Sequence, residues 1–232
     1  MNLPPLIEGR LVRRYKRFLA DVELADGSQI TAHTANPGAM TGLCDPGSRV
    51  LLSHHPTGKR KLPYSWQIVY VGRTPVGVNP VLANSIAREG IEAGVVRELT
   101  GYATLRPEVK VGDSRLDFEL DGPDRPRCLV EVKSVTLRVG SRGLFPDAPS
   151  ARGRRHLEEL IALKTGGDRA VLLFLVQRGD VRTVGPAREV DPAYGEALDA
   201  ARAAGVEVLA YRAAVEPSRR RIRLAAPLPL LD

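Results

Sequence analysis

The chain has 232 residues, of which 43% are hydrophobic, and it carries a formal net charge of +7. It is long enough for one large or two small domains, and it has neither an apolar run near the roughly 18 residues of a membrane helix nor a secretion signal at its start, so no membrane association is predicted. Two cysteines without motif spacing, Cys44 and Cys128, are typical of a reduced, cytoplasmic protein.

About the first 80 residues show a pattern of short strands separated by turns. We expect strands over residues 6–14, 18–23, 29–33, 49–53, 65–71 and 76–79, with Asp26-Gly27 as a hairpin turn. This many short strands in so short a segment is typical of a small β-barrel. Residues 1–80 are therefore predicted to form a barrel domain that resembles an OB-fold.

The remaining chain, residues 81–232, alternates helical and strand patterns. A helix is expected over residues 81–99, another from the N-cap Ser150 to about residue 164, and a third over 193–204. Residues 170–176 are all apolar, as in a strand that is buried on both faces, and residues 206–211 follow as a last strand. The alternation predicts an α/β domain with helices on the faces of its sheet.

Between these helices, residues 105–133 predict three consecutive antiparallel strands. A two-residue turn at Gly112-Asp113 places Val111 opposite Ser114 and therefore Glu108 opposite Asp117. If the next turn is centred on Asp124, Asp117 faces Glu131 and Phe118 faces Val130. Three carboxylates then lie in one row across the sheet, with Lys133 two residues beyond Glu131 on the same face.

A row of like charges destabilises a sheet unless a cation lies among them. Carboxylate oxygens suit Mg²⁺ or Mn²⁺, and such an ion activates water and stabilises charge on a phosphate. Asp117, Glu131, Lys133 and Glu108 are therefore candidate catalytic residues, with Asp117 and Glu131 as metal ligands. The alternative is a solvated sheet face on which neighbouring lysines and arginines neutralise the acids.

Four basic segments, 13–17, 59–61, 152–155 and 219–223, indicate affinity for a polyanion. The candidate nucleic-acid-binding residues are Arg13, Arg14, Lys16, Arg17, Lys59, Arg60, Lys61, Arg152, Arg155 and His156. Each segment taken alone is more often a solvated surface, and it is the presence of four in one small protein that favours nucleic acid. His156 has three possible roles: a phosphate contact, support of the carboxylates, or surface packing.

Aromatic residues accompany the first two basic segments. Tyr15 and Phe18 interleave with the first, and Tyr64, Trp66 and Tyr70 follow the second. OB-type barrels stack the bases of single strands on such rings. The same rings could instead fill the barrel core, and both interpretations remain open.

Several ordered blocks resemble the sugar fermentation stimulation protein A (SfsA) family. They include residues 17–20, 32–38 and 114–118, and the longest are 131–137 and 145–160. The resemblance implies an N-terminal OB-type barrel joined to a nuclease-like domain of the PD-(D/E)XK class. It also implies that an Asp and a Glu bind metal while a Lys assists, at positions that match Asp117, Glu131 and Lys133.

Two details of that class are less regular here. Leu116 stands where a literal Pro-Asp motif has proline. Many members of the class use a further upstream carboxylate, for which Glu98 or Glu108 are candidates, and the strand register favours Glu108.

These observations lead to two functional hypotheses. The first, which the family description supports, is a DNA-binding regulator of sugar metabolism, notably of maltose, that binds single- or double-stranded DNA on a nuclease-like scaffold. The second is a Mg²⁺- or Mn²⁺-dependent nuclease. No small-molecule cofactor is inferred, and the sequence gives no indication of a pocket for a sugar.

Overall fold

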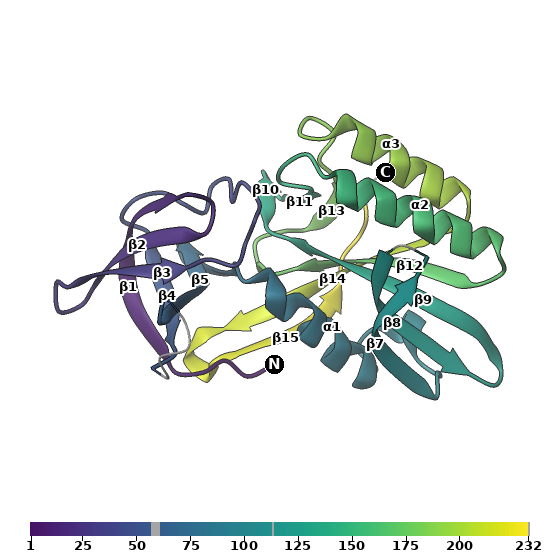
Figure 1. Cartoon of the computed structure of the whole chain (residues 1–232), viewed down its shortest axis with the longest axis horizontal. Coiled ribbons are helices and arrows are strands. Elements are labelled where there is room, and N and C mark those ends of the chain that lie inside the picture. Colours follow the sequence, from purple (N-terminus) through teal and green to yellow (C-terminus); the bar gives the residue numbers. More distant parts are fainter. Residues whose placement is uncertain (57–60, 113, 232) are drawn as a thin grey trace.

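A computed structural model describes residues 1–56, 61–112 and 114–231, and its first part is a closed barrel (Figure 1). The strands are β1 (Leu6–Tyr15), β2 (Leu19–Leu24), β3 (Gln29–His33), β4 (Arg49–His54), β5 (Tyr64–Val71) and β6 (Thr74–Gly77). Their order is β3-β2-β1-β4-β5-β6, and β3 also pairs with β5, which closes the sheet on itself. Trp66 is buried in the barrel core, so the core-filling interpretation holds for this ring.

The second part is a three-layered α/β domain. Its six-stranded sheet has the order β15-β14-β12-β9-β8-β7. The strands are β7 (Thr104–Val111), β8 (Ser114–Gly122), β9 (Arg125–Val135), β12 (Arg169–Val176), β14 (Glu207–Glu216) and β15 (Arg221–Pro227). The three central strands β9, β12 and β14 are parallel to one another, and the outer strands are antiparallel.

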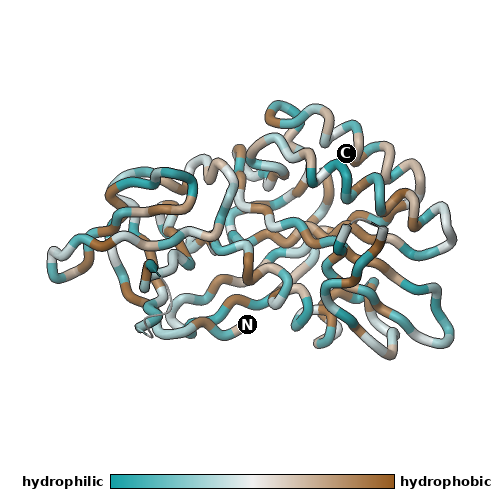
Figure 2. The backbone as a smooth tube through the Cα atoms, viewed as in Figure 1, coloured by the Kyte–Doolittle hydropathy of each residue, from teal (hydrophilic) through white to brown (hydrophobic). Residues whose placement is uncertain are grey.

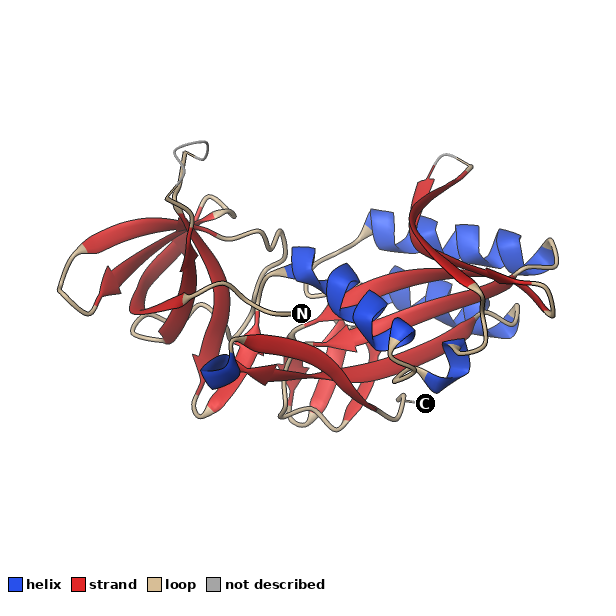
Figure 3. Cartoon of the chain, turned by 90° about the horizontal axis from the view of Figure 1, so that it is seen from below, coloured by secondary structure: helices blue, strands red, loops and turns tan. Residues whose placement is uncertain are grey.

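Helices cover both faces of this sheet. Helix α1 (Ala83–Glu92) lies on one face, and α2 (Ala151–Thr165) and α3 (Pro192–Ala203) lie together on the other (Figures 1 and 3). A smaller sheet of β10 (Leu137–Val139), β11 (Arg142–Phe145) and β13 (Thr183–Pro186) leads into α2. Short 3₁₀ turns occupy Pro80–Leu82, Arg97–Leu99 and Pro217–Arg219.

The apolar strand β12 is the centre of the domain, as its sequence predicts. Alternate side chains such as Leu173 and Phe174 enter two separate cores, one beneath α1 and one beneath α2 and α3. In Figure 2 the central strands are accordingly coloured mostly brown, for hydrophobic residues, and many of the outer turns are teal, for hydrophilic ones. Burial on both faces is what a parallel strand between two helical layers requires.

Helix α1 is shorter than the helix predicted over residues 81–99, so the prediction was wrong in length. Helix α1 ends at Glu92 because Gly94 adopts a φ of +70°, a left-handed conformation that closes a helix and favours glycine. The stretch after it forms a turn and the short 3₁₀ helix at Arg97–Leu99. By contrast, α2 begins where expected, with the Ser150 hydroxyl accepting a hydrogen bond from the Gly153 amide at 3.0 Å.

Asp191 joins the starts of the two outer helices. Its carboxylate, 4% exposed, accepts bonds from the Tyr194 amide at 3.0 Å and the Ser150 amide at 2.8 Å, and it pairs with Arg154. We expect Asp191→Ala to lower the free energy of unfolding by about 3 kcal/mol, because a cap and a buried ionic contact are lost together. Urea titration measures this. Asp199→Ala, which breaks an exposed pair with Arg188, is the control and should cost less than about 0.5 kcal/mol; equal effects would contradict the argument.

The barrel is joined to the α/β domain along a seam. Near the N-terminus, the Leu3 amide donates a hydrogen bond to the carbonyl of Arg220, between β14 and β15, at 2.7 Å. The Gly77 amide donates to the Gln177 carbonyl at 2.9 Å, and the Met40 amide donates to the Asp147 carboxylate at 3.0 Å. These contacts hold the barrel beside the ends of β9 and β12. Within the described ranges, no helix has both the length and the apolar character needed to cross a bilayer.

Candidate metal centre and nucleic-acid interface

The strand register derived from the turns is confirmed on either side of the acids, although Glu108–Asp117 and Asp117–Glu131 are not themselves strand pairs. Val111 pairs with Ser114 and Val109 with Leu116 between β7 and β8, and Phe118 pairs with Val130 between β8 and β9. Asp113 of the first turn lies outside the described residues. The register brings Asp117, Glu131 and Lys133 to one region, where β8 and β9 separate.

Asp117 lies at the point of separation. Its Oδ2 accepts a hydrogen bond from the Val132 amide at 2.7 Å, so this amide bonds to a side chain rather than to a strand carbonyl. On either side of it the alternation of β8 changes: Phe118 packs in the core beneath α1, whereas Leu116 packs in the core beneath α2 and α3. Residues two apart share one face in a regular strand, so the pleat of β8 is interrupted at Asp117.

Glu131, Lys133 and His156 form a buried cluster between β9 and α2. Their exposed fractions are 3%, 8% and 2%. Lys133 Nζ donates to Glu131 Oε1 at 2.7 Å, and the same oxygen contacts His156 Nδ1. The expectation of a solvated sheet face is thus wrong for this part of the sheet, because α2 covers it.

The hydrogen bonds of His156 define its tautomer. Arg152 Nε donates to His156 Nε2 at 3.2 Å, so this ring nitrogen carries no proton and Nδ1 carries it. Nδ1 then donates to Glu131, and its 3.3 Å approach to Lys133 Nζ is a contact between two donors rather than a hydrogen bond. His156 therefore orients Glu131, which is the supporting role among those considered for it, and its burial leaves it away from a phosphate.

The electrostatics of the two carboxylates differ. Burial, together with the charge of Glu131, raises the pKa of Asp117 to about 6. Burial acts in the same direction on Glu131, but the bonds from His156 and the charge of Lys133 outweigh it and lower the pKa of that carboxyl. Glu131 thus keeps its negative charge, whereas burial and the charge of Glu131 outweigh the charge of Lys133 at Asp117.

This donor set fits a hard divalent cation. Glu131 Oε2 is buried and has no hydrogen-bond partner among the described atoms, which leaves one carboxylate oxygen available as a ligand. No group of three or more His, Cys, Asp and Glu side chains converges within the described ranges. Two carboxylates and several waters are sufficient for Mg²⁺.

The structure does not bring Glu108 to this centre. Glu108 has a φ of +54°, which breaks the regular pleat of β7, and its exposed carboxylate pairs with Arg115 at 2.9 Å. Glu98, the other upstream candidate, accepts a hydrogen bond from the Tyr211 hydroxyl at 2.6 Å and does not contact Asp117. The placement of Glu108 in the acidic row was therefore wrong.

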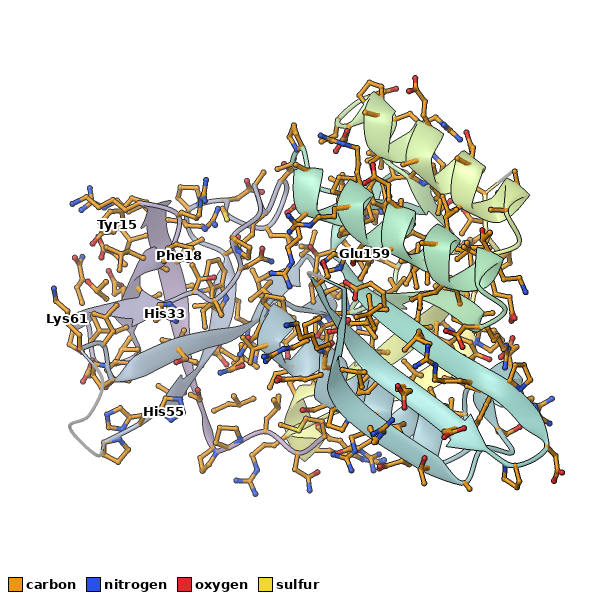
Figure 4. All side chains as sticks on the ribbon, turned by 45° about the vertical axis from the view of Figure 1, so that its right-hand side comes forward. Tyr15, Phe18, His33, His55, Lys61 and Glu159 are labelled. Carbon is orange, nitrogen blue, oxygen red and sulfur yellow. The ribbon has the colours of Figure 1, made fainter. Side chains whose placement is uncertain are left out.

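Asn84 occupies the place that an upstream acid was expected to fill. Its Nδ2 donates to Asp117 Oδ1 at 2.6 Å from the first turn of α1. Two other polar atoms near α2 also escaped the sequence analysis, namely Glu159 Oε2 and Tyr194 Oη, which are buried without a partner among the described residues. Glu159 lies where α2 faces the sheet (Figure 4), and the charge of Glu131 helps burial to raise the pKa of Tyr194.

The centre opens toward a pocket between the two domains, the interdomain pocket, of about 400 Å³. One wall comes from the barrel, through Arg17 and residues 36–38, and the other from residues 132–134 and the 145–150 loop. Lys133 lines this pocket directly. Neither acid lines the pocket itself, but both adjoin Val132, which does: Glu131 precedes it in β9, and Asp117 accepts a hydrogen bond from its amide.

Arg17 reaches this pocket from a tight turn between β1 and β2. Lys16 and Arg17 have φ values of +46° and +63°, and neither is a glycine. Such conformations cost on the order of 1 kcal/mol each, and strain of this kind concentrates at functional sites. Both side chains are exposed, and no ion pair of Arg17 is found with a described residue. Arg17 is therefore a cation available to a ligand in the pocket.

Other basic residues have different surroundings. Arg14 donates to the carbonyls of Asn36, Gly38 and Ala39, and Arg13 pairs with Asp21, so both stabilise the barrel. Lys61, Arg152 and Arg155 are exposed, and Arg152 also donates a hydrogen bond to His156. Lys59 and Arg60 lie outside the described residues. In the fourth basic segment, Glu216 pairs with Arg219, Arg221 and Arg223.

Comparison with known proteins covers the whole chain. A family model described as "SfsA N-terminal OB domain" matches residues 12–78, and one described as "Sugar fermentation stimulation protein RE domain" matches residues 81–219. A sugar fermentation stimulation protein homolog from Pelobacter propionicus is 53% identical over 232 residues, covering 100% of both chains. One from Geobacter sulfurreducens is 52% identical, covering 100% of this chain and 99% of that protein.

A solved structure is also similar, that of SfsA from Pyrococcus furiosus in complex with Ca²⁺. It has 29% sequence identity and a TM-score of 0.90, and the match covers 100% of this chain and 98% of that one. The predicted fold class is confirmed as an OB-like barrel followed by an α/β domain.

Proposed function

The chain belongs to the sugar fermentation stimulation protein (SfsA) family, and from this premise we propose that it binds DNA in the interdomain pocket and hydrolyses phosphodiester bonds there with a divalent ion. The observation that carries the proposal is the buried Glu131–Lys133–His156 cluster beside Asp117, which adjoins a pocket that Arg17 and Lys133 line together with Asp147. Binding alone requires no lysine and carboxylates buried in this arrangement, and burying them is energetically costly.

Each residue has a role that follows from its contacts. Asp117 and Glu131 would hold Mg²⁺ or Mn²⁺, and when bound such an ion lowers the pKa of water and offsets charge on a phosphate. Lys133 faces the interdomain pocket, where its ammonium group positions the attacking water or neutralises a phosphate oxygen as a point charge. His156 fixes Glu131, and Arg17 from the facing barrel wall contacts the DNA backbone.

The solved relative supports the choice of a hard cation. It was obtained in complex with Ca²⁺, an ion that takes oxygen ligands, as Mg²⁺ does. Mg²⁺ and Mn²⁺ are proposed as the active ions because a smaller ion demands the closer, more regular coordination that suits catalysis.

The direct test incubates the purified chain with single- and double-stranded DNA and a series of concentrations of Mg²⁺, Mn²⁺ or Ca²⁺. Cleavage that requires Mg²⁺ or Mn²⁺ and stops with a chelator is the expected result. Salt-dependent binding without cleavage under any metal would instead favour the second candidate, a DNA-binding regulator of sugar (maltose) metabolism. That candidate rests on the family description and on the cations of the interdomain pocket.

Arg17→Ala tests the binding half of the proposal. If Arg17 neutralises one phosphate, the slope of log affinity against log salt should fall by about 0.9 for duplex DNA, with weaker binding to every sequence. Fluorescence anisotropy over a salt series measures it. Arg73→Ala is the matched control, since Arg73 is also exposed in a turn of the barrel but does not line the pocket. Equal slopes for the wild type and Arg17→Ala would exclude this contact.

A further inference from the structure

The barrel carries a second and larger pocket, of about 730 Å³, which we call the barrel pocket. It lies between β3, β4 and β5, the first residues of the chain and the turn at Pro80–Leu82. Much of its wall is apolar, including Leu3, Leu62 and Leu82. A concave, mainly apolar site with a few polar groups is the usual form of a small-molecule or base site.

A row of polar side chains crosses the floor of this pocket. Asn79 Nδ2 donates to Gln67 Oε1 at 2.9 Å, Gln67 Nε2 donates to Ser53 Oγ at 2.9 Å, and Ser53 Oγ contacts His55 Nε2 at 3.0 Å. Ser53 and Gln67 are 0% and 6% exposed. Each amide nitrogen has a second hydrogen and Gln67 Oε1 a second lone pair, so the row retains both donors and acceptors for the edge of a planar ring.

The rim of the pocket is cationic and aromatic. Lys61 and His33 are exposed and line it, and the His33 ring stacks on Phe18 with centroids 6.3 Å apart. Phe18 is 41% exposed, so part of its ring is accessible to a ligand. In Figure 4, Tyr15, Phe18, His33, Lys61 and His55 lie along the barrel, with Tyr15 at one end and His55 at the other.

The barrel pocket adjoins the interdomain pocket. Ala35 lines the barrel pocket and the next residue, Asn36, lines the interdomain pocket. Likewise Val81 lines the barrel pocket and Pro80 the interdomain pocket. Consecutive Cα atoms are about 3.8 Å apart, so the two pockets are separated by little more than one residue of chain. Arg17, next to Phe18 in sequence, reaches the interdomain pocket. A strand whose backbone passes the catalytic cluster therefore has the barrel pocket within reach of a neighbouring base.

We propose that the barrel pocket takes one unpaired nucleobase of a single-stranded segment whose backbone passes the interdomain pocket. The inference rests on the proposed function and specifies its substrate as DNA with an unpaired region. A base presents a flat apolar face for the leucine walls and an edge for the Gln67 and Asn79 amides, whereas a sugar presents hydroxyls in all directions to walls that offer no bonds. A base inside a duplex must first be unpaired and unstacked, at a cost of a few kcal/mol, before it can enter.

The test measures what a single base adds to the binding of a strand. The probe is a fluorescent eight-nucleotide strand with all bases absent, compared with the same strand carrying one central thymine, and the intact full-length chain is used. We expect the thymine to raise affinity about tenfold, within the range for a base held by a protein site. Because the protein can shift along the strand to the one base, this comparison does not depend on register.

Two variants locate the effect. Ala35→Phe fills the pocket from its partly exposed wall and should reduce the gain from thymine to less than twofold, without changing affinity for the strand that lacks bases. Ala25→Phe makes the same change at an exposed turn of the barrel outside the pocket and should keep the full gain. Thermal melting checks that both variants fold. A tenfold gain that persists in folded Ala35→Phe would overturn the proposal.

If Ala35→Phe does not fold, a measurement on the wild type alone still tests the proposal. With 2-aminopurine as the single base, binding should shield its emission from acrylamide, whereas equal quenching in the free and bound strands would overturn the inference. Free 2-aminopurine deoxynucleotide that binds as tightly as the strand would also overturn it, by indicating a nucleotide pocket. If the wild type binds neither strand nor duplex DNA, the proposed function fails as well. If it binds both strands equally, only the pocket assignment fails.

Discussion

Glu131→Gln is expected to reduce metal-dependent cleavage of DNA on the order of 10³-fold while the chain remains folded. The substitution keeps the size of the side chain, and the amide oxygen can still accept from Lys133 and His156. It removes the negative charge that the divalent ion requires, in a site where burial makes electrostatic interactions strong. Single-turnover cleavage with saturating Mn²⁺ measures the rate, and circular dichroism checks the fold.

Glu108→Gln is the matched control for this prediction. Glu108 stands in the neighbouring part of the same sheet, and its sequence position suggested a place in the site, but its carboxylate is exposed and pairs with Arg115. Cleavage should be unchanged within about twofold. If Glu131→Gln cleaves like the wild type, or if both substitutions reduce cleavage equally, the metal centre proposed for β8 and β9 is wrong.

Lys133→Met is expected to reduce cleavage on the order of 10²-fold or more with little change in binding of the divalent ion. Both carboxylates stay in place, but the ammonium group that faces the interdomain pocket is lost. The decisive observation is the split between the two measurements, cleavage rate and metal affinity.

Lys110→Met, in β7, controls for the loss of a lysine from the same sheet, since Lys110 is exposed and lies outside the cluster. It should leave both quantities unchanged. Lys133→Met with a normal cleavage rate would show that this lysine is a structural partner of Glu131 and takes no part in the reaction.

The register of β7 and β8 could be derived from sequence because a predicted two-residue turn determines it, whereas that of β8 and β9 depended on centring the next turn on Asp124. Once Val111 faces Ser114, the pairs of β7 and β8 follow by counting, and the segregation of apolar and charged residues supports that alignment. Glu108 shows where this reasoning fails. Counting assumes a regular pleat, and a residue at a φ of +54° points its side chain elsewhere while the pairs on either side keep their register.

Contacts between distant segments were beyond the sequence pattern. Asn84 reaches Asp117 across 33 positions, and it carries no charge that would have attracted attention to it. The short strands β10, β11 and β13 and the strand β15 were not predicted. Of these, β13 pairs with the distant β11, whereas β10 pairs with the adjacent β11 and β15 with the adjacent β14. The two pockets arise from the seam between domains and from the turn at Pro80–Leu82, which no local pattern describes.

The basic segments illustrate the same limit. Local charge predicts a cationic surface, but it does not distinguish Arg14, which binds barrel carbonyls, from Arg17, three residues later, which faces the pocket. The fourth segment is also basic in sequence, yet Glu216 pairs with three of its arginines. Which cations remain available to DNA is determined by the fold.

Titration of Mn²⁺ followed by electron paramagnetic resonance, on the wild type and on Asp117→Asn, tests most directly whether the two acids hold an ion. We predict that the wild type binds Mn²⁺ in a site that added Mg²⁺ empties by competition, and that Asp117→Asn weakens this binding by at least about tenfold at an unchanged melting temperature. Identical Mn²⁺ binding by the two proteins would contradict the proposed centre.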